Sequence, residues 1–159
     1  MTDLSPRKAA ILDHSQKFAH SRAEWRRKAR FFHTEDETYL RFLVPKGARV
    51  LEIGCGTGDT LAALQPAYGV GVDMSPDLIA EAGRLHPDLT FIVGDAESAD
   101  TYKEITGTFD YIIVVDTIGS LDDCQAFMSR LHPLCTRETR IVIGYFSHLW
   151  SPALKLAEL

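Results

Sequence analysis

A short glycine-rich stretch, residues 50–59, constrains this chain more than any other part of its sequence. It begins with apolar residues typical of an interior parallel strand. Three glycines then alternate, at Gly54, Gly56 and Gly58. Glycine has no Cβ atom, so it permits a positive φ angle and lets a ligand lie against the backbone. Asp59 or Thr60 can cap the helix that follows, where free N–H groups favour negatively charged ligand atoms.

The spacing of these glycines excludes two common nucleotide-binding loops. A dinucleotide fingerprint reads G-x-G-x-x-G, but Asp59 stands where the third glycine is required, and the Gly-Lys-Ser/Thr of a Walker loop is absent. What remains is Glu-x-Gly-x-Gly-x-Gly, which begins at Glu52 and resembles motif I of the class I S-adenosylmethionine-dependent methyltransferases. A tight turn without a ligand is the alternative, although three alternating glycines cost conformational entropy that a plain turn does not require.

After the N-terminal segment, strand and helix patterns alternate. Strands are predicted where apolar and β-branched residues cluster, at residues 49–53, 69–73, 90–93, 109–115 and 140–145. Helices are predicted between them, one capped by Ser75 with Pro76 in its first turn and another opened by Asp122 and Asp123. A last short helix is predicted over residues 152–159. Such alternation implies a parallel sheet with right-handed crossovers.

Residues 1–44 differ in character from the rest, and we expect them to form a helical cap on a domain spanning residues 45–159. Apolar residues seven positions apart predict one helix from residue 6 to about residue 33. A second, short helix is predicted to begin at Glu35 and to end before Pro45. The basic face of the long helix is either solvated, or it forms a lid over a ligand or contacts an acidic substrate.

Charge and cysteine content exclude several classes of function. The first 50 residues carry 11 Lys and Arg against 6 Asp and Glu, whereas the remaining residues carry 6 against 16. This acidic body argues against nucleic acid as a partner. Cys55, Cys124 and Cys135 lack metal-like spacing, which predicts reduced thiols, a cytoplasmic protein and no metal site. The sequence shows neither an apolar N-terminal signal nor a run long enough to span a membrane.

Polar residues end the second and third predicted strands, and in an open parallel sheet ligands bind beyond the carboxyl ends of the strands. Asp73 follows the start of the glycine loop by about 20 residues, where a carboxylate can accept hydrogen bonds from both ribose hydroxyls. Met74 can pack on an adenine face. The Asp95 carboxylate suits an adenine amino group and the Ala96 backbone N–H suits a ring nitrogen, as in the resembled family. An ordinary turn acid is the alternative for Asp95.

Three further positions bear on chemistry at this edge. The fourth strand ends at Asp116 and Thr117, which in the resembled family flank the methionine part and the transferred methyl group. Glu52 lies near the end of a buried strand, where a carboxylate is costly unless paired. It either holds the glycine loop by accepting its N–H groups or meets the ammonium of a ligand. The catalytic base is not identified, and its candidates are Asp116, His148 and His33, with a capping role as the alternative for Asp116.

The resemblance covers residues 40–146 and implies a Rossmann-like, doubly wound α/β sheet of order 3-2-1-4-5 with S-adenosylmethionine as cofactor. The residues that it assigns to the cofactor are Glu52, Ile53, Gly54, Cys55, Gly56, Gly58, Asp73, Met74, Asp95, Ala96, Asp116 and Thr117. Within the family, the type 11/12-like domains fused to glycosyltransferases in bacteria are similar over residues 41–47, 119–121 and 145–150.

The resembled fold has seven strands, but five are found before the sequence stops at Leu159. We therefore expect the C-terminal strands to be missing and the fifth strand to be an exposed edge that self-associates. The implied function is methyl transfer to an unidentified small-molecule acceptor. Two alternatives are a cofactor-binding module without its own catalysis, as in a fragment of a larger enzyme, and a nicotinamide-dependent oxidoreductase. The broken dinucleotide fingerprint argues against the latter.

Overall fold

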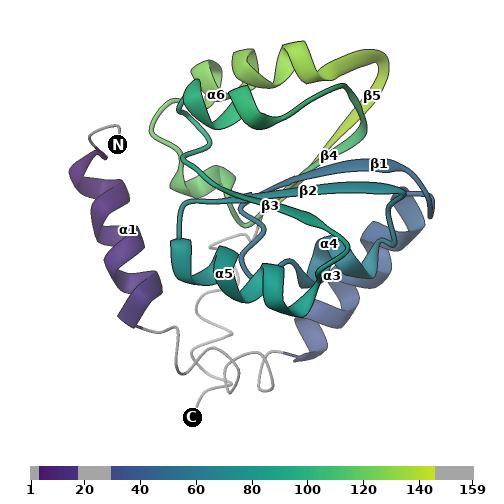
Figure 1. The fold of residues 1–159 in the computed structure, drawn as a ribbon, viewed down its shortest axis with the longest axis horizontal. Helices are drawn as coiled ribbons and strands as arrows, with labels where there is room; N and C mark the ends of the chain where they lie inside the picture. Colours follow the sequence, from purple (N-terminus) through teal and green to yellow (C-terminus); the bar gives the residue numbers. More distant parts are fainter. Residues whose placement is uncertain (1–3, 18–29, 146–159) are drawn as a thin grey trace.

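Five parallel strands form a single sheet in the computed structural model, which describes residues 4–17 and 30–145 of the chain. Their order is β3-β2-β1-β4-β5, which confirms the predicted order (Figure 1). The strands are β1 (Arg49–Ile53), β2 (Tyr68–Asp73), β3 (Thr90–Val93), β4 (Phe109–Val115) and β5 (Cys135–Gly144). Because every neighbouring pair is parallel, the carboxyl ends of the strands meet at one edge of the sheet.

Helices cover both faces of this sheet. The described α-helices are α1 (Pro6–Lys17), α3 (Arg30–Leu43), α4 (Asp59–Ala63), α5 (Pro76–Leu85) and α6 (Cys124–Leu131). Short 3₁₀ turns are η2 (Asp100–Glu104), η3 (Ile118–Ser120) and η4 (His132–Leu134). Figure 1 shows α3, α4 and α5 below the sheet and α6 above it, while α1 lies to one side. This is the doubly wound α/β architecture that the sequence predicted.

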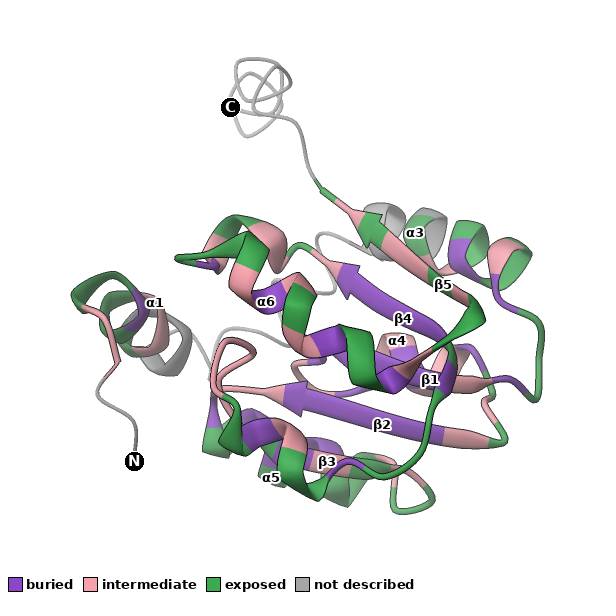
Figure 2. Cartoon of the chain, turned by 90° about the horizontal axis from the view of Figure 1, so that it is seen from above, coloured by how far each residue is buried: buried purple, intermediate pink, exposed green. Residues whose placement is uncertain are grey.

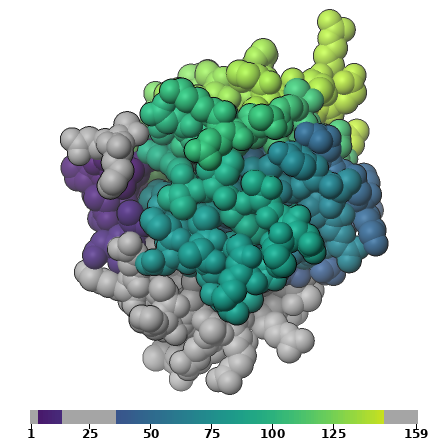
Figure 3. All heavy atoms as spheres, in the orientation of Figure 1, coloured from purple at the N-terminus to yellow at the C-terminus, as the bar shows by residue number. Residues whose placement is uncertain are grey.

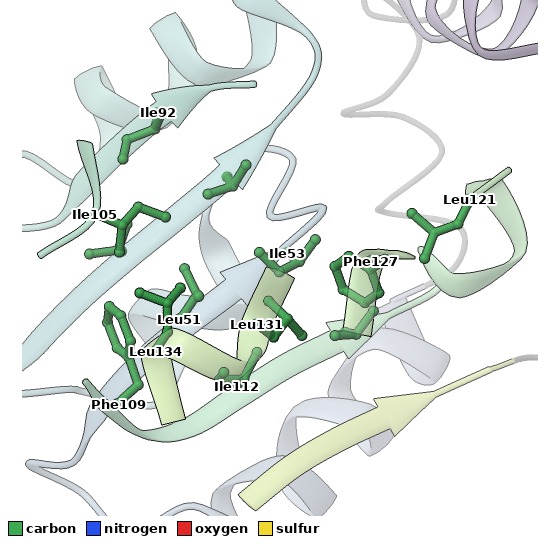
Figure 4. Close-up of a cluster of buried hydrophobic side chains, with 13 residues drawn as sticks. Leu51, Ile53, Ile92, Ile105, Phe109, Ile112, Leu121, Phe127, Leu131 and Leu134 are labelled. Atoms are coloured by element: carbon green, nitrogen blue, oxygen red, sulfur yellow. The ribbon is translucent and has the colours of Figure 1, made fainter. Parts of the chain in front are cut away.

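Alternate residues along each strand face opposite sides, which divides the core into two clusters. The cluster against α6 is drawn in Figure 4 and includes Leu51, Ile53, Ile112, Phe127 and Leu131. The cluster against α3 and α4 includes Leu40, Val44, Val50, Leu61 and Ile113. By the same alternation, Glu52 lies on the face that α3 and α4 cover. A carboxyl group is therefore placed among apolar side chains.

Two helix starts agree with their predicted caps. The Ser75 hydroxyl accepts a hydrogen bond from the Leu78 backbone N–H, and Pro76 occupies the first turn of α5. The Asp123 carboxylate accepts from the Ala126 N–H at 2.9 Å at the start of α6. Both side chains satisfy N–H groups that have no partner within their helices.

The N-terminal helices differ from the prediction of one helix over residues 6–33 and a second from Glu35. Helix α3 instead runs without a break from Arg30 to Leu43, so the expected boundary after His33 is wrong. Leu40 and Val44 bury the end of this segment against the sheet, which overrides the local signal for a helix start at the acidic residues. The helix predicted for residues 152–159 lies outside the described residues.

Strand β5 begins at Cys135, five residues before the predicted start at Arg140. Its pairing changes register between Phe109 and Tyr111, which face Cys135 and Arg140 respectively. Inside this irregularity the Thr139 hydroxyl donates to the Phe109 carbonyl at 2.6 Å. The first part of β5 was not predicted because residues 136–139 are polar and lack apolar alternation. A bulge at these residues connects the two parts of the strand.

Two negative findings concern the described residues alone. None of their helices has the length and apolar character needed to cross a membrane. In the same ranges, no group of three or more His, Cys, Asp or Glu side chains could hold a metal ion.

The outer edge of β5 predicts self-association. Within the described residues β5 pairs only with β4, and Ile143 is 47% exposed on it. Open strand edges pair with other chains, and a lysine on the edge opposes this. We expect Ile143→Lys to lower the apparent mass in concentration-dependent light scattering.

The matched control is Val93→Lys on the opposite edge, where β3 is short and Val93 is similarly exposed at 49%. A wild-type chain that stays monomeric at all concentrations would contradict the prediction, as would an equal response to both lysines.

Candidate functional site

The parallel sheet gathers most of the predicted site residues at one edge. Figure 2 shows the arrowheads of β2 and β4 pointing to the same side, with α1 beyond them. The glycine loop follows β1, Asp73 ends β2, and Asp95 and Asp116 follow β3 and β4. Of the three candidates for a base, Asp116 alone has a described side chain. His33 is described only as part of the α3 backbone, and His148 lies outside the described residues.

All three glycines of the loop adopt left-handed backbone conformations. Their φ angles are 78° at Gly54, 55° at Gly56 and 74° at Gly58. A Cβ atom on Gly54 would lie 1.9 Å from the Thr117 hydroxyl oxygen, and one on Gly58 would lie 2.5 Å from the Phe91 ring. Close packing on neighbouring loops and strands therefore requires glycine at two of these positions.

The start of α4 is capped differently from the prediction. Gly58 is the N-cap residue and no local side chain caps the helix, so the assignment of Asp59 or Thr60 as cap is wrong. The Asp59 carboxylate instead accepts from the Thr57 hydroxyl at 2.5 Å and lies 3.2 Å from the His86 ring. Through these contacts the Asp59 side chain connects the glycine loop to His86 at the end of α5.

Glu52 performs the capping that the local residues do not. Its carboxyl group accepts a hydrogen bond from the backbone N–H of Leu61 in the first turn of α4. Leu61 follows the glycine loop, whereas one of the two alternatives predicted that Glu52 accepts from N–H groups of the loop itself. The side chain is buried, and among the described residues its Oε2 atom has no hydrogen-bond partner. Burial, reinforced by the charge of Asp73, raises the pKa of Glu52 to about 8, so the group holds a proton at neutral pH.

Asp73 joins three parts of the edge. Its Oδ2 atom accepts from the Gly56 N–H and its Oδ1 atom from the Ser75 N–H, each at 2.9 Å. The Val72 carbonyl next to it accepts from the N–H groups of Gly54 and Cys55. A carboxylate has about four lone-pair positions, so Asp73 retains capacity for further donors.

The neighbouring predicted residues are packed in different ways. Ile53 is buried in the core cluster against α6. Cys55 is also buried, and burial raises the pKa of its thiol, so it fills space as an uncharged group. Met74 is half-buried after the end of β2. The Ala96 carbonyl accepts from the Tyr102 hydroxyl at 2.6 Å, which fixes the loop after β3.

The loop after β3 contains an ion cluster that sequence reasoning missed. The ammonium group of Lys8 in α1 donates to both carboxylate oxygens of Asp95, at 2.7 and 2.6 Å, and lies 2.5 Å from Glu97. The Lys8 side chain is only 5% exposed. Burial opposes charge on Lys8 and Glu97, but hydrogen bonds to Asp95 and Glu97 raise the pKa of Lys8, and the bond from Lys8 lowers the pKa of Glu97.

Helix α1 is also tied to the loop after β4. Arg7 donates to the carbonyl oxygens of Gly119 and Leu121 and lies 3.6 Å from the Asp122 carboxylate. Glu97 accepts from the backbone N–H groups of Asp122 and Asp123, at 2.9 and 2.6 Å. Helix α1 thus bridges the two loops. Its purple atoms lie at the left of the molecule in Figure 3.

The end of β4 places its two predicted residues against the glycine loop and β5. Asp116 has a left-handed φ of 52°, and its backbone N–H donates to the Gly144 carbonyl at 3.0 Å. The Thr117 hydroxyl donates to the Val115 carbonyl at 2.9 Å and lies where a side chain on Gly54 would be. The Asp116 side chain is exposed at this edge.

Residues 50–138 match the family model for a methyltransferase domain. The chain is 31% identical over 112 residues to norajmaline N-methyltransferase of Rauvolfia serpentina, which covers 65% of this chain and 37% of that protein. It is 32% identical over 110 residues to demethylmenaquinone methyltransferase of Beutenbergia cavernae, with 67% and 44% covered. The chain thus spans less than half the length of these relatives.

Solved structures share the fold at lower identity. A possible histamine N-methyltransferase of Thermotoga maritima gives a TM-score of 0.73 at 21% identity, covering 93% of this chain and 69% of that one. The magnesium protoporphyrin IX methyltransferase of Synechocystis with bound S-adenosylhomocysteine gives 0.68 at 21% identity, covering 96% and 78%.

The buried Glu52 carboxyl group predicts a specific pH dependence. The folded protein keeps this proton up to a pKa of about 8, whereas the unfolded chain loses it near the ordinary value of 4.5. The contribution of Glu52 to stability therefore falls as pH rises from 4.5 to 8, by up to about 1.4 kcal/mol per pH unit. We expect Glu52→Gln to flatten the dependence of the unfolding free energy on pH in this window, measured by urea titration.

Glu81→Gln serves as the control, because Glu81 is exposed and pairs with Arg84, which lowers its pKa below the window. Equal slopes for Glu52→Gln and the wild type between pH 5 and 8 would show that Glu52 is ionised when folded.

Proposed function

The chain belongs to the family of methyltransferase domains, and on that premise we propose that it binds S-adenosylmethionine along the carboxyl ends of β1–β4 and transfers its methyl group to a small-molecule acceptor. The observation that supports this most directly is the Asp73 carboxylate. Two backbone N–H groups hold it beside the glycine loop, and its remaining lone pairs suit a pair of ribose hydroxyls.

The residues at this edge fit such a cofactor. The loop from Gly54 to Gly58, with its three glycines at positive φ, presents mostly backbone to the methionine part. Met74 is placed after the ribose-binding acid, and Asp95 and Ala96 are assigned to the adenine ring. The buried Glu52 oxygen that has no partner in the described part of the chain lies beside the loop, where the ammonium group of the ligand would find an acceptor.

This pairing would change the protonation of Glu52. A cation close to a carboxyl group lowers its pKa, so ligand binding would favour the carboxylate over the acid. The proton that Glu52 holds at neutral pH would then be released on binding. Glu52 thereby serves the helix start of α4 with one oxygen and the ligand with the other.

When bound, the cofactor supplies an electrophilic methyl group on a sulfonium centre. The protein then has to hold an acceptor in line with that methyl group and exclude water, so proximity and orientation dominate. Thr117 and Asp116 are the residues proposed to lie nearest to it. Asp116 is the candidate with a described side chain for taking a proton from a neutral acceptor, and His33 and His148 remain alternatives.

A small-molecule acceptor is supported by the names of the relatives, which describe enzymes acting on norajmaline and demethylmenaquinone. The three cysteines are free thiols in the structure, which agrees with the cytoplasmic setting expected from the sequence. Because the chain spans less than half of those relatives, binding without turnover is the alternative that an assay must separate from catalysis.

Calorimetric titration with S-adenosylhomocysteine tests the proposal. Asp73→Ala should weaken binding by about 1.5–3 kcal/mol, or about ten- to hundred-fold, the scale of hydrogen bonds to a charged group. Asp73→Asn keeps one acceptor oxygen, so its affinity should lie between those of the wild type and Asp73→Ala. Asp77→Ala, an exposed acid in the first turn of α5, should leave the affinity unchanged.

An unaltered dissociation constant for folded Asp73→Ala would remove the ribose assignment, and binding of NAD in place of S-adenosylhomocysteine would favour the oxidoreductase. A labelled-methyl assay with a panel of small molecules then distinguishes a catalyst from a binding module.

A further inference from the structure

We propose that Lys8 of helix α1 is a positioning residue for the cofactor: it fixes the Asp95 carboxylate for the adenine amino group, so that α1 docking and cofactor binding stabilise each other. This inference rests on the proposed function, because it takes Asp95 as the acceptor for adenine. It adds a residue 87 positions away in the sequence that the methyltransferase motifs do not include.

The hydrogen-bond inventory of the cluster carries the proposal. Lys8 uses its three protons on the two oxygens of Asp95 and on Glu97. Asp95 Oδ1 also accepts from the Glu97 backbone N–H at 2.9 Å, and the Asp95 carbonyl accepts from the Thr101 hydroxyl at 2.7 Å. Within the described residues, three of the roughly four lone-pair positions on the Asp95 carboxylate are thus occupied. One position remains on Oδ2, in an orientation that Lys8 sets.

An amino group on adenine would use this remaining position rather than displace Lys8. The carboxylates of Asp95 and Glu97 both contact the ammonium group of Lys8. Removing Lys8 would leave them as adjacent like charges. Breaking a buried pair by removing one partner costs far more than one hydrogen bond from a neutral amino group returns. The ion cluster therefore stays intact when the ligand binds, and Lys8 acts through Asp95.

The same contacts couple the ligand to the helix. Helix α1 holds the loop after β3 through Lys8 and the loop after β4 through Arg7. A ligand that favours the Asp95 orientation imposed by Lys8 also favours docked α1, and by thermodynamic linkage docked α1 favours that ligand to the same degree. Fixing the acceptor in advance lowers the entropy lost on binding.

Discrimination between two ligands tests Lys8 directly. S-Inosylhomocysteine carries a carbonyl oxygen where S-adenosylhomocysteine carries the amino group, so it lacks the amino donor to Asp95. Its N1 atom also carries a hydrogen and no longer accepts from the Ala96 N–H, but this second change is the same in the wild type and in the Lys8 variants. We expect the wild type to bind the adenosyl compound at least ten-fold more tightly and Lys8→Met to lose at least five-fold of that preference. Lys8→Arg, which keeps the charge, should restore part of it. The matched control is Lys103→Met, which removes an exposed lysine paired with Asp100 and should keep the full preference.

A double-mutant cycle shows whether Lys8 acts through Asp95. In an Asp95→Ala background, Lys8→Met should change the affinity for S-adenosylhomocysteine by less than two-fold. A second full loss there would mean that Lys8 touches the ligand itself and would overturn the positioning role.

Hydrogen exchange on the wild type provides a test that no folding defect can confuse. At saturation, S-adenosylhomocysteine should protect the amides of residues 6–17 more than S-inosylhomocysteine does. Equal protection, an unchanged preference in Lys8→Met, or tighter binding in Lys8→Met would overturn the inference. If the wild type binds neither compound, the proposed function fails as well; if it binds both equally, the cofactor site stands and only the adenine coupling fails.

Discussion

The arrangement of loops at the carboxyl-terminal edge of the sheet depends on the hydrogen bonds that the Asp73 carboxylate accepts. Parallel strands bring their loops to one side of the sheet, where backbone N–H groups need partners outside the strand ladders. Asp73 accepts from Gly56 and Ser75, while the preceding carbonyl of Val72 accepts from Gly54 and Cys55. The end of β2 therefore sets the shape of the glycine loop and the start of α5 together. A loop held in this way is already organised for a ligand.

Acidic groups at the edge are accommodated by three different means. Asp73 is held by backbone N–H groups, and Asp95 and Glu97 share the ammonium of Lys8. Within the described residues no cation is paired with Glu52, and burial raises its pKa to about 8, which keeps it protonated instead. The three solutions leave different capacities: Asp73 has lone pairs to spare, Asp95 has one oriented position, and Glu52 has an oxygen whose charge depends on what binds. A ligand carrying hydroxyls, an amino group and an ammonium matches this set.

Local signals predicted most of the fold because they reflect local physics. Clusters of apolar and β-branched residues indicated the strands β1–β4, and Ser75 with Pro76 indicated the start of α5. The failures occurred where distant contacts decide. Residues 136–139 join β5 through a bulge rather than by apolar alternation, and burial of Leu40 and Val44 extends α3 through the expected break. Lys8 was missed because nothing in its own helix indicates a carboxylate 87 positions away.

The glycines themselves are weaker evidence for a ligand than their pattern implies. Gly54 and Gly58 are required by close packing on Thr117 and Phe91, which a turn without a ligand would also demand. The stronger evidence is the hydrogen-bonding capacity that the surrounding carboxyl groups leave unused. Among the described residues one buried oxygen of Glu52 has no partner, which costs free energy that a purely structural capping residue would avoid, since a neutral amide or hydroxyl could accept from Leu61 as well. An acid at this position is explained if the cation of a ligand pairs with the second oxygen of Glu52. The chemistry of the site then depends on the acidic residue that begins the motif.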